Sequence, residues 1–414
     1  MYIKRDLEAT IEKFLESPEI IAIVGPRQSG KTTLINHIYV NFKNNAVLLS
    51  FEDPTTLSMF EKDTPSFIDL YVKSNKIIFI DEFQYSQNGG KILKEIYDSH
   101  DIKIIITGSS SIDLTVKALK YLVGRIFTFE LLPFNFREFL KTKDKKYLEM
   151  YDNIRINLKN ISNIKALNFG EEIFIIFKSM FQEYCLYGGY PRVVLSKDYE
   201  EKRVVLRNIY STFFLREVKD YLGLIDDYKL QQLIKALALN TGNLIEYKEL
   251  SMHSGYSFSS LKRYINFLEK TYICFLIKPF FRNKLKEIVK NPKVYFLDSG
   301  LRNSVINDFR DFKDRIDIGF LIENSIFMQL RKSGYPINYW RDKAKREIDF
   351  VIDEIPHLCL EIKYNLQKCK ASHFIKEFIN NYPQFSFVFL YQEGFQKTVQ
   401  EEANIFKLPC FVLA

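Results

Sequence analysis

The pattern of apolar and polar positions changes along the chain, and the first 140 residues have the clearest pattern. Short, nearly continuous runs of Ile, Val, Leu and Phe alternate there with helical patterns. Strands covered on both faces by helices have this composition in parallel sheets. The runs predict strands at residues 20–24, 46–51, 76–80, 102–106 and 127–131. The amino-terminal region is therefore expected to be an α/β domain with a parallel sheet.

Later segments differ from this pattern. Residues 134–230 are mostly helical in periodicity, with a break at Gly188-Gly189-Tyr190-Pro191 and a polar stretch at 155–168 that we expect to be an exposed insertion. Three helices and a hairpin follow between 229 and 297. After residue 298 an α/β pattern returns, and it predicts helices at 319–332 and 370–380 and strands at 336–340, 347–353, 357–363 and 385–391.

Composition limits the class of protein. At 414 residues, the chain is too long for one hydrophobic core, and its 47% hydrophobic content is typical of a globular protein. The formal net charge of +8 is compatible with an acidic partner such as nucleic acid without requiring one. The five scattered cysteines argue against a disulfide framework, and no apolar run is long enough to span a membrane. We therefore expect a cytoplasmic protein without a membrane partner.

The strongest motif lies directly after the first predicted strand. It has the form GxxxxGK[ST], whose glycines let the backbone wrap phosphates while amide groups and a helix N-terminus point at them. Lys31 is expected to pair with the β- and γ-phosphates of ATP, and Thr32 to ligate Mg²⁺. The nucleotide-binding residues predicted here are Gly25, Pro26, Arg27, Gln28, Ser29, Gly30, Lys31, Thr32 and Thr33.

Two carboxylates follow the third predicted strand and support the same interpretation. Asp81 is expected to hold the magnesium shell, and Glu82 to polarise the attacking water. The fourth strand ends in Thr107-Gly108-Ser109-Ser110-Ser111. A polar group at that strand end would sense the γ-phosphate or position water, whereas Ser109 to Ser111 would equally well cap a helix.

These motifs, together with Gly124-Arg125 and Leu132-Pro133-Phe134, resemble a large family of prokaryotic AAA-type ATPases. Members carry a carboxyl-terminal domain of unknown function, and the resemblance spans nearly the whole chain. It implies ATP hydrolysis and makes Arg125 a candidate for stabilising transition-state charge. A structural ion pair is an equal alternative for Arg125, and action in cis or across subunits of a homo-oligomer is left open.

The region 229–297 has the proportions of a winged helix, a fold that often binds DNA. Its third helix would place Leu261, Ile265 and Leu268 inward and Lys262, Arg263 and Asn266 outward. The following basic stretch would serve as a wing that contacts phosphates, through Lys278, Arg282, Lys284, Lys286, Lys290 and Lys293. The alternative is a helical domain that docks proteins and carries a solvated basic loop.

The carboxyl-terminal region carries a second cluster of chemical interest. Strand alternation places Glu361 and Lys363 on one face, and a short hairpin brings Asp349 close to them. Two carboxylates and a lysine suit metal-assisted phosphodiester hydrolysis. With Glu323 on the preceding helix, the set resembles the restriction-endonuclease-like PD-(D/E)xK fold, in which Glu323, Asp349 and Glu361 would bind metal. The alternatives are a structural ion-pair cluster or a nuclease fold that has lost activity.

The sequence thus predicts four regions: an ATPase domain at 1–140, a helical lid or linker at 141–228, a winged-helix-like domain at 229–297 and a nuclease-like domain at 298–414. Three functions fit them. They are an ATPase coupled to a DNA-directed nuclease, an ATP-driven switch whose carboxyl-terminal half binds without cutting, and a loader-type ATPase that oligomerises on nucleic acid.

Overall fold

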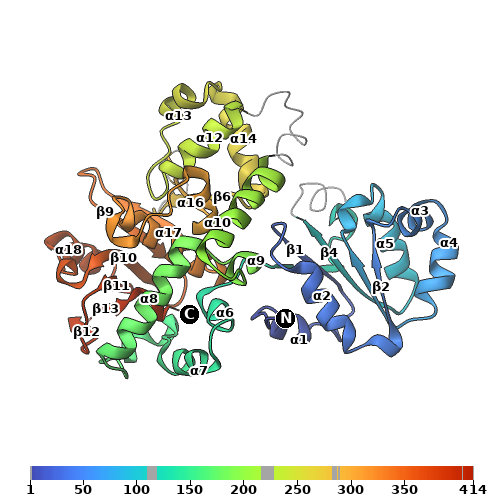
Figure 1. Cartoon of the computed structure of the whole chain (residues 1–414), viewed down its shortest axis with the longest axis horizontal. Helices are drawn as coiled ribbons and strands as arrows, with labels where there is room; N and C mark the ends of the chain where they lie inside the picture. The colour runs from blue at the N-terminus through green and yellow to red at the C-terminus, as the bar shows by residue number, and fades with distance from the viewer. Residues whose placement is uncertain are drawn as a thin grey trace. The chain divides into compact units, whose positions relative to one another are not determined.

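The computed structural model describes residues 2–109, 119–215, 228–281, 287, 290–402 and 404–413. The chain forms two compact units (Figure 1). The first comprises residues 1–134 and 270–272, and the second comprises 135–269 and 273–414. The predicted boundary at residue 140 stays a prediction, and the three later regions fall in the second unit apart from residues 270–272. Their finer boundaries at 228 and 297 stay predictions.

The first unit has a three-layer α/β arrangement. Its strands are β1 (Ile20–Gly25), β2 (Ala46–Ser50), β3 (Ile77–Asp81), β4 (Lys103–Ser109) and β5 (Ile126–Glu130). Its α-helices are α1 (Glu8–Lys13), α2 (Lys31–Val40), α3 (Pro54–Lys62), α4 (Thr64–Phe67) and α5 (Gly89–Ser99). Short 3-10 or π turns lie at η1 (Lys43–Asn45), η2 (Ile68–Val72), η3 (Phe83–Tyr85) and η5 (Leu119–Tyr121).

The sheet of this unit confirms the predicted strands and their direction. Its order is β2-β3-β4-β1-β5, and every neighbouring pair is parallel. One face packs on α1 and α2 through a core that includes Leu34 and Ile38. The other face packs on α3, α4 and α5 through a core that includes Phe60 and Leu93. Helices cover β1, β3 and β4 on both faces, and the sequences of these strands are therefore nearly continuous apolar runs.

The second unit combines many helices with a mixed sheet. Its α-helices are α6 (Phe136–Leu140), α7 (Lys145–Ile154), α8 (Glu171–Tyr187), α9 (Pro191–Val194), α10 (Tyr199–Asn208), α12 (Tyr228–Leu239), α13 (Tyr247–Ser254), α14 (Phe258–Lys270), α16 (Ser299–Ile306), α17 (Ile318–Lys332) and α18 (His373–Asn381). Its strands are β6 (Cys274–Pro279), β7 (Lys293–Phe296), β8 (Asn338–Arg341), β9 (Glu347–Ile352), β10 (Leu358–Asn365), β11 (Ser386–Glu393), β12 (Gln400–Glu402) and β13 (Ile405–Pro409). Short 3-10 or π turns lie at η6 (Leu158–Asn163), η7 (Ile209–Leu215), η8 (Phe312–Asp314), η9 (Leu366–Lys368) and η10 (Cys410–Val412).

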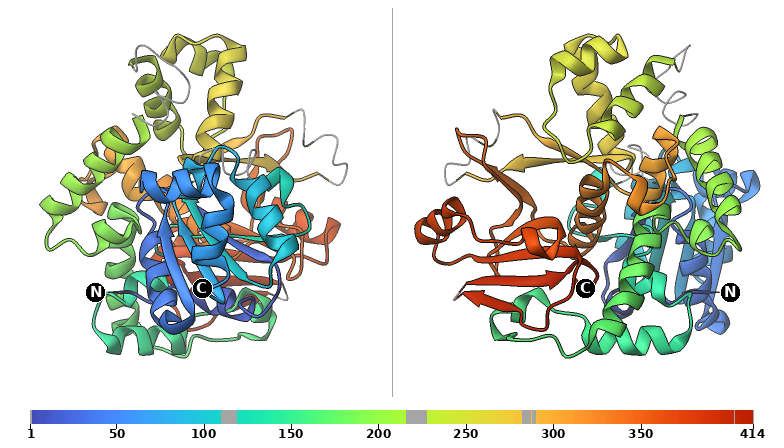
Figure 2. Two further views of the ribbon diagram at one scale, coloured as in Figure 1. Left: turned by 90° about the vertical axis from the view of Figure 1, so that its right-hand side faces the viewer. Right: turned by 60° about the vertical axis from the view of Figure 1, so that its left-hand side comes forward.

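The mixed sheet has the order β12-β13-β11-β10-β9-β8-β6-β7. Strands β8, β9 and β10 pair antiparallel in succession, and β10 pairs parallel with β11. Helix α17 packs on β10 (Figure 2). The helices and strands predicted after residue 298 are therefore confirmed with small shifts of their ends. The sequence pattern did not predict the edge strand β12 or its neighbour β13.

The predicted three helices and hairpin are also present, as α12, α13, α14 and the antiparallel pair β6–β7. Leu261, Ile265 and Leu268 are buried on α14, as the helical period predicts. The hairpin is not isolated from the remaining strands, because β6 also pairs with β8 through Lys278 and Pro279. It therefore extends the mixed sheet at one end.

The prediction of an exposed insertion at 155–168 is wrong for its apolar positions. Ile156, Leu158, Ile161 and Leu167 are buried, while most polar residues between them are exposed. Ile156 forms an isolated bridge with Leu413, so the segment is tied to the end of the chain. The polar composition hid the apolar positions, which are spaced closely enough to give the segment a buried side.

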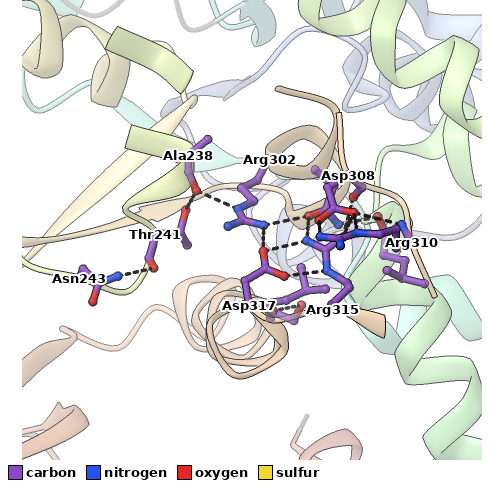
Figure 3. A network of polar contacts seen from close by, with 12 residues as sticks. Ala238, Thr241, Asn243, Arg302, Asp308, Arg310, Arg315 and Asp317 are labelled. Atoms are coloured by element: carbon purple, nitrogen blue, oxygen red, sulfur yellow. Dashed lines mark hydrogen bonds and ion pairs between the residues drawn. The ribbon is translucent and has the colours of Figure 1, made fainter. Parts of the chain in front are cut away.

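A buried ion network secures the start of α17 (Figure 3). The guanidinium of Arg315 donates from Nε to Asp317 Oδ1 at 2.9 Å and from Nη2 to Asp317 Oδ2 at 2.8 Å. Arg302 pairs with the same carboxylate and donates to the carbonyl of Ala238 at the end of α12, at 2.9 Å. The network thus connects α12, α16 and α17, the helix that carries Glu323.

Candidate functional site

The phosphate loop, residues 25–32, joins β1 to α2 at the carboxyl edge of the parallel sheet. A Cβ atom on Gly25 would lie 2.3 Å from the carbonyl oxygen of Leu131, so only glycine fits there. Gly30 has φ 96°, a conformation that favours glycine, immediately before α2 begins. The loop therefore has the backbone shape that the two motif glycines predict.

The ammonium of Lys31 lies inside this loop. Its Nζ donates hydrogen bonds to the carbonyls of Gly25 at 3.0 Å and Pro26 at 2.9 Å. The residue is only 5% exposed, so its charge is held where phosphates would be bound. Thr32 and Thr33 lie exposed in the first turn of α2.

Arg5 supports the phosphate loop from outside the motif. Its Nη1 donates to the carbonyl of Ser29 at 2.7 Å, and its Nη2 donates to the carbonyl of Leu132 at 2.5 Å. The guanidinium also lies 4.8 Å from the ring centroid of Phe134. Arg5 therefore joins the phosphate loop to the Leu132-Pro133-Phe134 turn, which gives that turn a structural role. Sequence patterns gave no signal for Arg5.

Asp81 and Thr107 lie at the ends of neighbouring strands. The buried hydroxyl of Thr107 donates a hydrogen bond to Asp81 Oδ1. Glu82 follows with φ 54°, and its carboxylate accepts a hydrogen bond from the side-chain amide of Gln84. The structure thus brings both predicted carboxylates to the carboxyl edge of the sheet, with a polar partner for each.

Two buried hydroxyls at this edge support the fit to a polar ligand. Ser29 Oγ in the phosphate loop and Ser109 Oγ at the end of β4 have no hydrogen-bond partner among the described residues. Ser109 is a strand residue, and the capping alternative for Ser110 and Ser111 lies outside the described residues. Buried polar atoms without partners are uncommon, and a bound phosphate group would satisfy such hydroxyls.

Arg125 is not brought to the phosphate loop. It immediately precedes β5, and its carbonyl accepts a hydrogen bond from Ile20 at the first residue of β1. Because β1 and β5 are parallel, Arg125 lies at the opposite edge of the sheet from the loop. Its Nε pairs with Asp98 at 2.7 Å. A catalytic role in cis is therefore contradicted by this placement, and the ion-pair alternative describes what is observed. A role across subunits stays a prediction.

The predicted carboxyl-terminal cluster assembles on adjacent strands of the second unit. Asp349 Oδ2 accepts a hydrogen bond from the backbone N–H of Ile362 at 2.8 Å. Lys363 Nζ pairs with Glu361 Oε1 at 2.6 Å, and burial together with the Asp349 charge raises the pKa of Glu361. Glu323 also contributes to that electrostatic environment, so the four predicted residues converge.

Lys293 enters the same cluster from β7, contrary to its prediction as an exposed wing residue. Its Nζ lies 2.5 Å from Glu347 Oε1 and 3.4 Å from Glu323 Oε1, and the residue is only 2% exposed. Tyr295 donates a hydrogen bond to the Glu323 carboxylate as well. Although burial lowers the pKa of Lys293, the carboxylates around it raise that pKa above its ordinary value on balance. Glu323 is therefore already paired within the protein.

The carboxylate cluster fits a metal ion only in part. Among the described residues, no group of three or more His, Cys, Asp and Glu side chains is arranged to hold one. However, Glu361 Oε2 is buried and lacks a hydrogen-bond partner there, while Glu361 and Asp349 lie close together. The pair Asp349 and Glu361 thus fits a cation better than Glu323 does. The assignment of all three as metal ligands stays a prediction.

The predicted recognition helix exposes its expected face. Lys262, Arg263 and Asn266 are exposed on α14, and Lys278 and Lys290 are exposed on the following segments. Arg282, Lys284 and Lys286 lie outside the described residues. Two basic residues close in sequence to Asp349 are paired with acids, because Arg346 pairs with Asp342 and Arg341 pairs with Glu347.

Three segments of the chain match known protein families. Residues 17–140 match the AAA domain family, so this part of the chain is similar to AAA-type P-loop ATPase domains. Residues 178–311 match a domain of unknown function, DUF8612, and residues 318–411 match another, DUF4143. The ion network of Figure 3 lies at the end of the first of these segments, because Arg302 and Asp308 belong to it, whereas Arg315 and Asp317 lie between the two segments.

Relatives of the whole chain are known from sequence. An uncharacterized protein of Methanocaldococcus jannaschii is 26% identical over 428 residues, which cover 99% of this chain and 90% of the relative. An uncharacterized protein of Haemophilus influenzae is 26% identical over 360 residues and covers 82% of this chain and 80% of its own length. Among solved structures, a Walker-type ATPase of Pyrococcus abyssi matches with a TM-score of 0.44 and 16% identity, over 73% of this chain and 96% of that one. No helix in the described ranges is long and apolar enough to cross a membrane.

Proposed function

We propose that the chain hydrolyses ATP at the phosphate loop and uses the cycle to control how its second unit engages DNA. The observation that carries the first part is the assembly of Lys31, Asp81 and Glu82 at one edge of a parallel sheet. Phosphoryl transfer needs a loop that binds the phosphates and, beside it, a carboxylate at a strand end that holds Mg²⁺.

Each residue has a distinct role in this proposal. Lys31 would exchange its bonds to the loop carbonyls for bonds to the β- and γ-phosphates. Thr32 and Asp81 would hold Mg²⁺, which neutralises phosphate charge when bound. Glu82 would leave Gln84 to accept a hydrogen bond from the attacking water, and Thr107 would keep Asp81 oriented.

The substitution Glu82→Gln tests these roles. It removes the charge that polarises water but keeps the side-chain size, so ATP binding is expected to persist while turnover falls by about 100-fold or more. Lys73→Ala, on the exposed surface of the same unit, is the control that should leave both unchanged. Binding is measured with a fluorescent ATP analogue and turnover by phosphate release. Normal turnover in Glu82→Gln would contradict its role.

Nucleic-acid engagement is proposed from the exposed basic residues of the second unit. The proposal is supported by the exposure of Lys262 and Arg263 on α14, and by the exposure of Lys278 and Lys290 farther along the chain. Three helices followed by a hairpin would suit a winged helix. If these residues neutralise phosphates, duplex affinity will fall steeply between 50 and 200 mM salt. A flat salt response, measured by fluorescence anisotropy, would favour a protein partner. Stimulation of ATP turnover by DNA tests the coupling directly.

Metal-dependent phosphodiester cleavage is a second candidate function for residues 298–414. It is supported by the αβββαβ order from α17 to β11, by the closeness of Asp349 and Glu361, and by the unpartnered Glu361 Oε2. In this role Asp349 and Glu361 would bind the ion that neutralises the scissile phosphate, and Lys363 would orient water. The alternative is a nuclease-like domain that binds without cutting, in which Lys293 permanently neutralises the acids.

A cleavage panel separates these two possibilities. Single-stranded, duplex and branched DNA are incubated with Mg²⁺ or Mn²⁺, with and without ATP. Cleavage by the wild type that is lost in Lys363→Ala, with ATP turnover intact, would establish nuclease activity. Arg346→Ala provides a control for the nearby basic surface. The absence of cleavage under every condition would leave the binding-only domain as the proposed role.

A further inference from the structure

A cavity of about 490 Å³ lies among α13, α14 and the β6–β7 hairpin of the second unit. Its volume falls in the range of small-molecule sites, which is roughly 300–1,000 Å³. The cavity is lined by Glu246, Tyr247, Lys248, Phe258, Lys262, Glu269, Leu276, Lys278, Lys290, Asn291 and Pro292. These residues come from several elements, so the hollow is built by the fold and does not depend on a single loop.

Two aromatic rings form one part of the cavity. The rings of Tyr247 and Phe258 have centroids 5.3 Å apart and meet edge to face. Phe258 is 54% exposed, an unusual state for a large apolar side chain that is not needed for the core. An exposed ring supported by a second ring offers a rigid surface on which a planar ring can stack.

Lysines surround these rings. Lys262 Nζ lies 4.6 Å from the ring centroid of Phe258 and 6.0 Å from that of Tyr247. Lys248, Lys278 and Lys290 add their ammonium groups from α13, β6 and the segment before β7. Within the described ranges, Lys248 and Lys290 form no ion pair. Four cations thus face two acids, Glu246 and Glu269, so the site favours an anionic ligand.

Glu269 gives the cavity a polar group with a fixed position. Its Oε1 accepts the backbone N–H of Leu276 at 2.8 Å, which holds the carboxyl at the junction of α14 and β6. Burial raises the pKa of Glu269 above its ordinary value. The edge of a nucleobase presents donors and acceptors that suit such a group.

We propose that this cavity binds one nucleotide unit, with its base stacked on Phe258 and its phosphate held by Lys248, Lys262 and Lys290. The proposal rests on the nucleic-acid role proposed above and specifies an unpaired base as the element recognised. In a duplex both base faces are covered by neighbouring base pairs, so only an unpaired base can stack on the ring. A free mononucleotide and a nucleotide within a single strand share this chemistry.

Fluorescence anisotropy distinguishes these sources. A labelled 12-nucleotide single strand, the matching duplex and, as an unlabelled competitor, thymidine monophosphate are titrated with the full chain at fixed salt. Phe258→Ala is expected to weaken single-strand binding by about 5- to 100-fold, the range for loss of one base–aromatic stack. Duplex binding is expected to change less than about twofold. Phe258→Trp keeps a stacking ring and should preserve affinity.

Met252→Ala is the matched control, because Met252 is 75% exposed on α13 and does not line the cavity. Circular dichroism confirms that each variant is folded. If thymidine monophosphate competes with the single strand for the wild type but not for Phe258→Ala, the cavity binds free mononucleotides. If thymidine monophosphate does not compete and Phe258→Ala still weakens binding of the strand, the cavity binds a nucleotide within single-stranded nucleic acid. Both results support the proposal.

Two other results overturn it in distinguishable ways. If the wild type binds the single strand and Phe258→Ala binds it equally well, the cavity is not the nucleotide site, while the nucleic-acid role survives. If the wild type binds neither DNA form nor thymidine monophosphate, the nucleic-acid role and the cavity proposal both fail. Binding of an acidic peptide of a partner protein to this cavity would then be the role to test.

Discussion

The hydroxyl of Thr107 donates a hydrogen bond to the carboxylate of Asp81, across the ends of the neighbouring parallel strands β4 and β3. Both side chains are buried. The bond fixes the orientation of the acid that we propose to hold Mg²⁺ and places a polar group beside Glu82. It joins two motifs that lie 26 residues apart in the sequence into one site.

Removing this hydroxyl should impair turnover more than nucleotide binding. Thr107→Val keeps the side-chain shape but leaves Asp81 without its donor, so turnover is expected to fall by about 10- to 100-fold through misplacement of the acid. The dissociation constant for ATP should change little, because the phosphate loop is untouched. Thr128→Val, at an exposed position on β5, is the control. Equal turnover in the two variants would show that the hydrogen bond has no catalytic consequence.

Arg5 should matter for nucleotide affinity although it lies outside the motif. Arg5→Met removes two hydrogen bonds to loop carbonyls, one on Ser29 and one on Leu132. We expect the free energy of unfolding to fall by about 2 kcal/mol, the usual size for charged hydrogen bonds, and ATP affinity to weaken. Urea unfolding and ATP titration measure these effects. The neighbouring substitution Lys4→Met, at an exposed side chain, should produce neither.

Arg125 provides a test of assembly. Because it lies at the edge of the sheet opposite the phosphate loop, Arg125→Ala should leave turnover unchanged in a monomer. ATP hydrolysis is measured across a range of protein concentrations alongside the oligomeric state. Lys91→Ala on α5 serves as a surface control. A large loss of turnover that appears only as the protein assembles would instead assign Arg125 to a neighbouring subunit's site.

The network of Figure 3 predicts a pH-dependent contribution to stability. Burial would raise the pKa of Asp317, but the guanidinium groups of Arg315 and Arg302 hold it below its ordinary value. A carboxylate with a lowered folded-state pKa stabilises the fold above its unfolded pKa, about 4, and this contribution is lost as pH falls through the folded pKa. Stability should therefore decline below about pH 4.

Asp317→Asn should remove that dependence and lower stability at pH 7. Breaking a largely buried ion pair takes away the carboxylate that Arg302 and Arg315 share, while Arg315 keeps its pair with Asp308, and a loss of about 3 kcal/mol is expected. Asp314→Asn, at an exposed position three residues earlier, is the control. Urea unfolding at pH 7 and at about pH 2.5, below the unfolded-state pKa of a carboxylate, measures both quantities. An unchanged pH dependence in Asp317→Asn would mean that other carboxylates dominate acid unfolding.

The sequence carried most of the information about the phosphate loop. Continuous apolar runs predicted β1, β3 and β4, because a buried parallel strand needs apolar side chains on both faces. The two motif glycines predicted the turn, and the strand-end acids Asp81 and Glu82 were found from position alone. Parallel strands align their carboxyl ends, so local motifs were sufficient to predict one shared site.

Contacts between distant residues could not be predicted in the same way. Arg5 reaches Leu132, 127 residues away, and nothing in its local pattern distinguishes it from a solvated arginine. Lys293 was predicted to be an exposed wing residue, since its neighbours in sequence are basic. All four residues of β7 are buried, so alternation of exposed and buried positions is absent there. Its carboxylate partners, Glu323 and Glu347, become neighbours only through the fold.

The direct test of the central claim is ATP turnover by Lys31→Ala compared with the wild type, measured by phosphate release in Mg²⁺ with matched protein and nucleotide concentrations. Lys31 is the buried cation of the phosphate loop, and its removal takes away the charge proposed to hold the β- and γ-phosphates. Loss of turnover to background, with the variant folded and Lys73→Ala fully active, is the predicted result. Full turnover by Lys31→Ala would contradict the claim that this loop is the site of ATP hydrolysis.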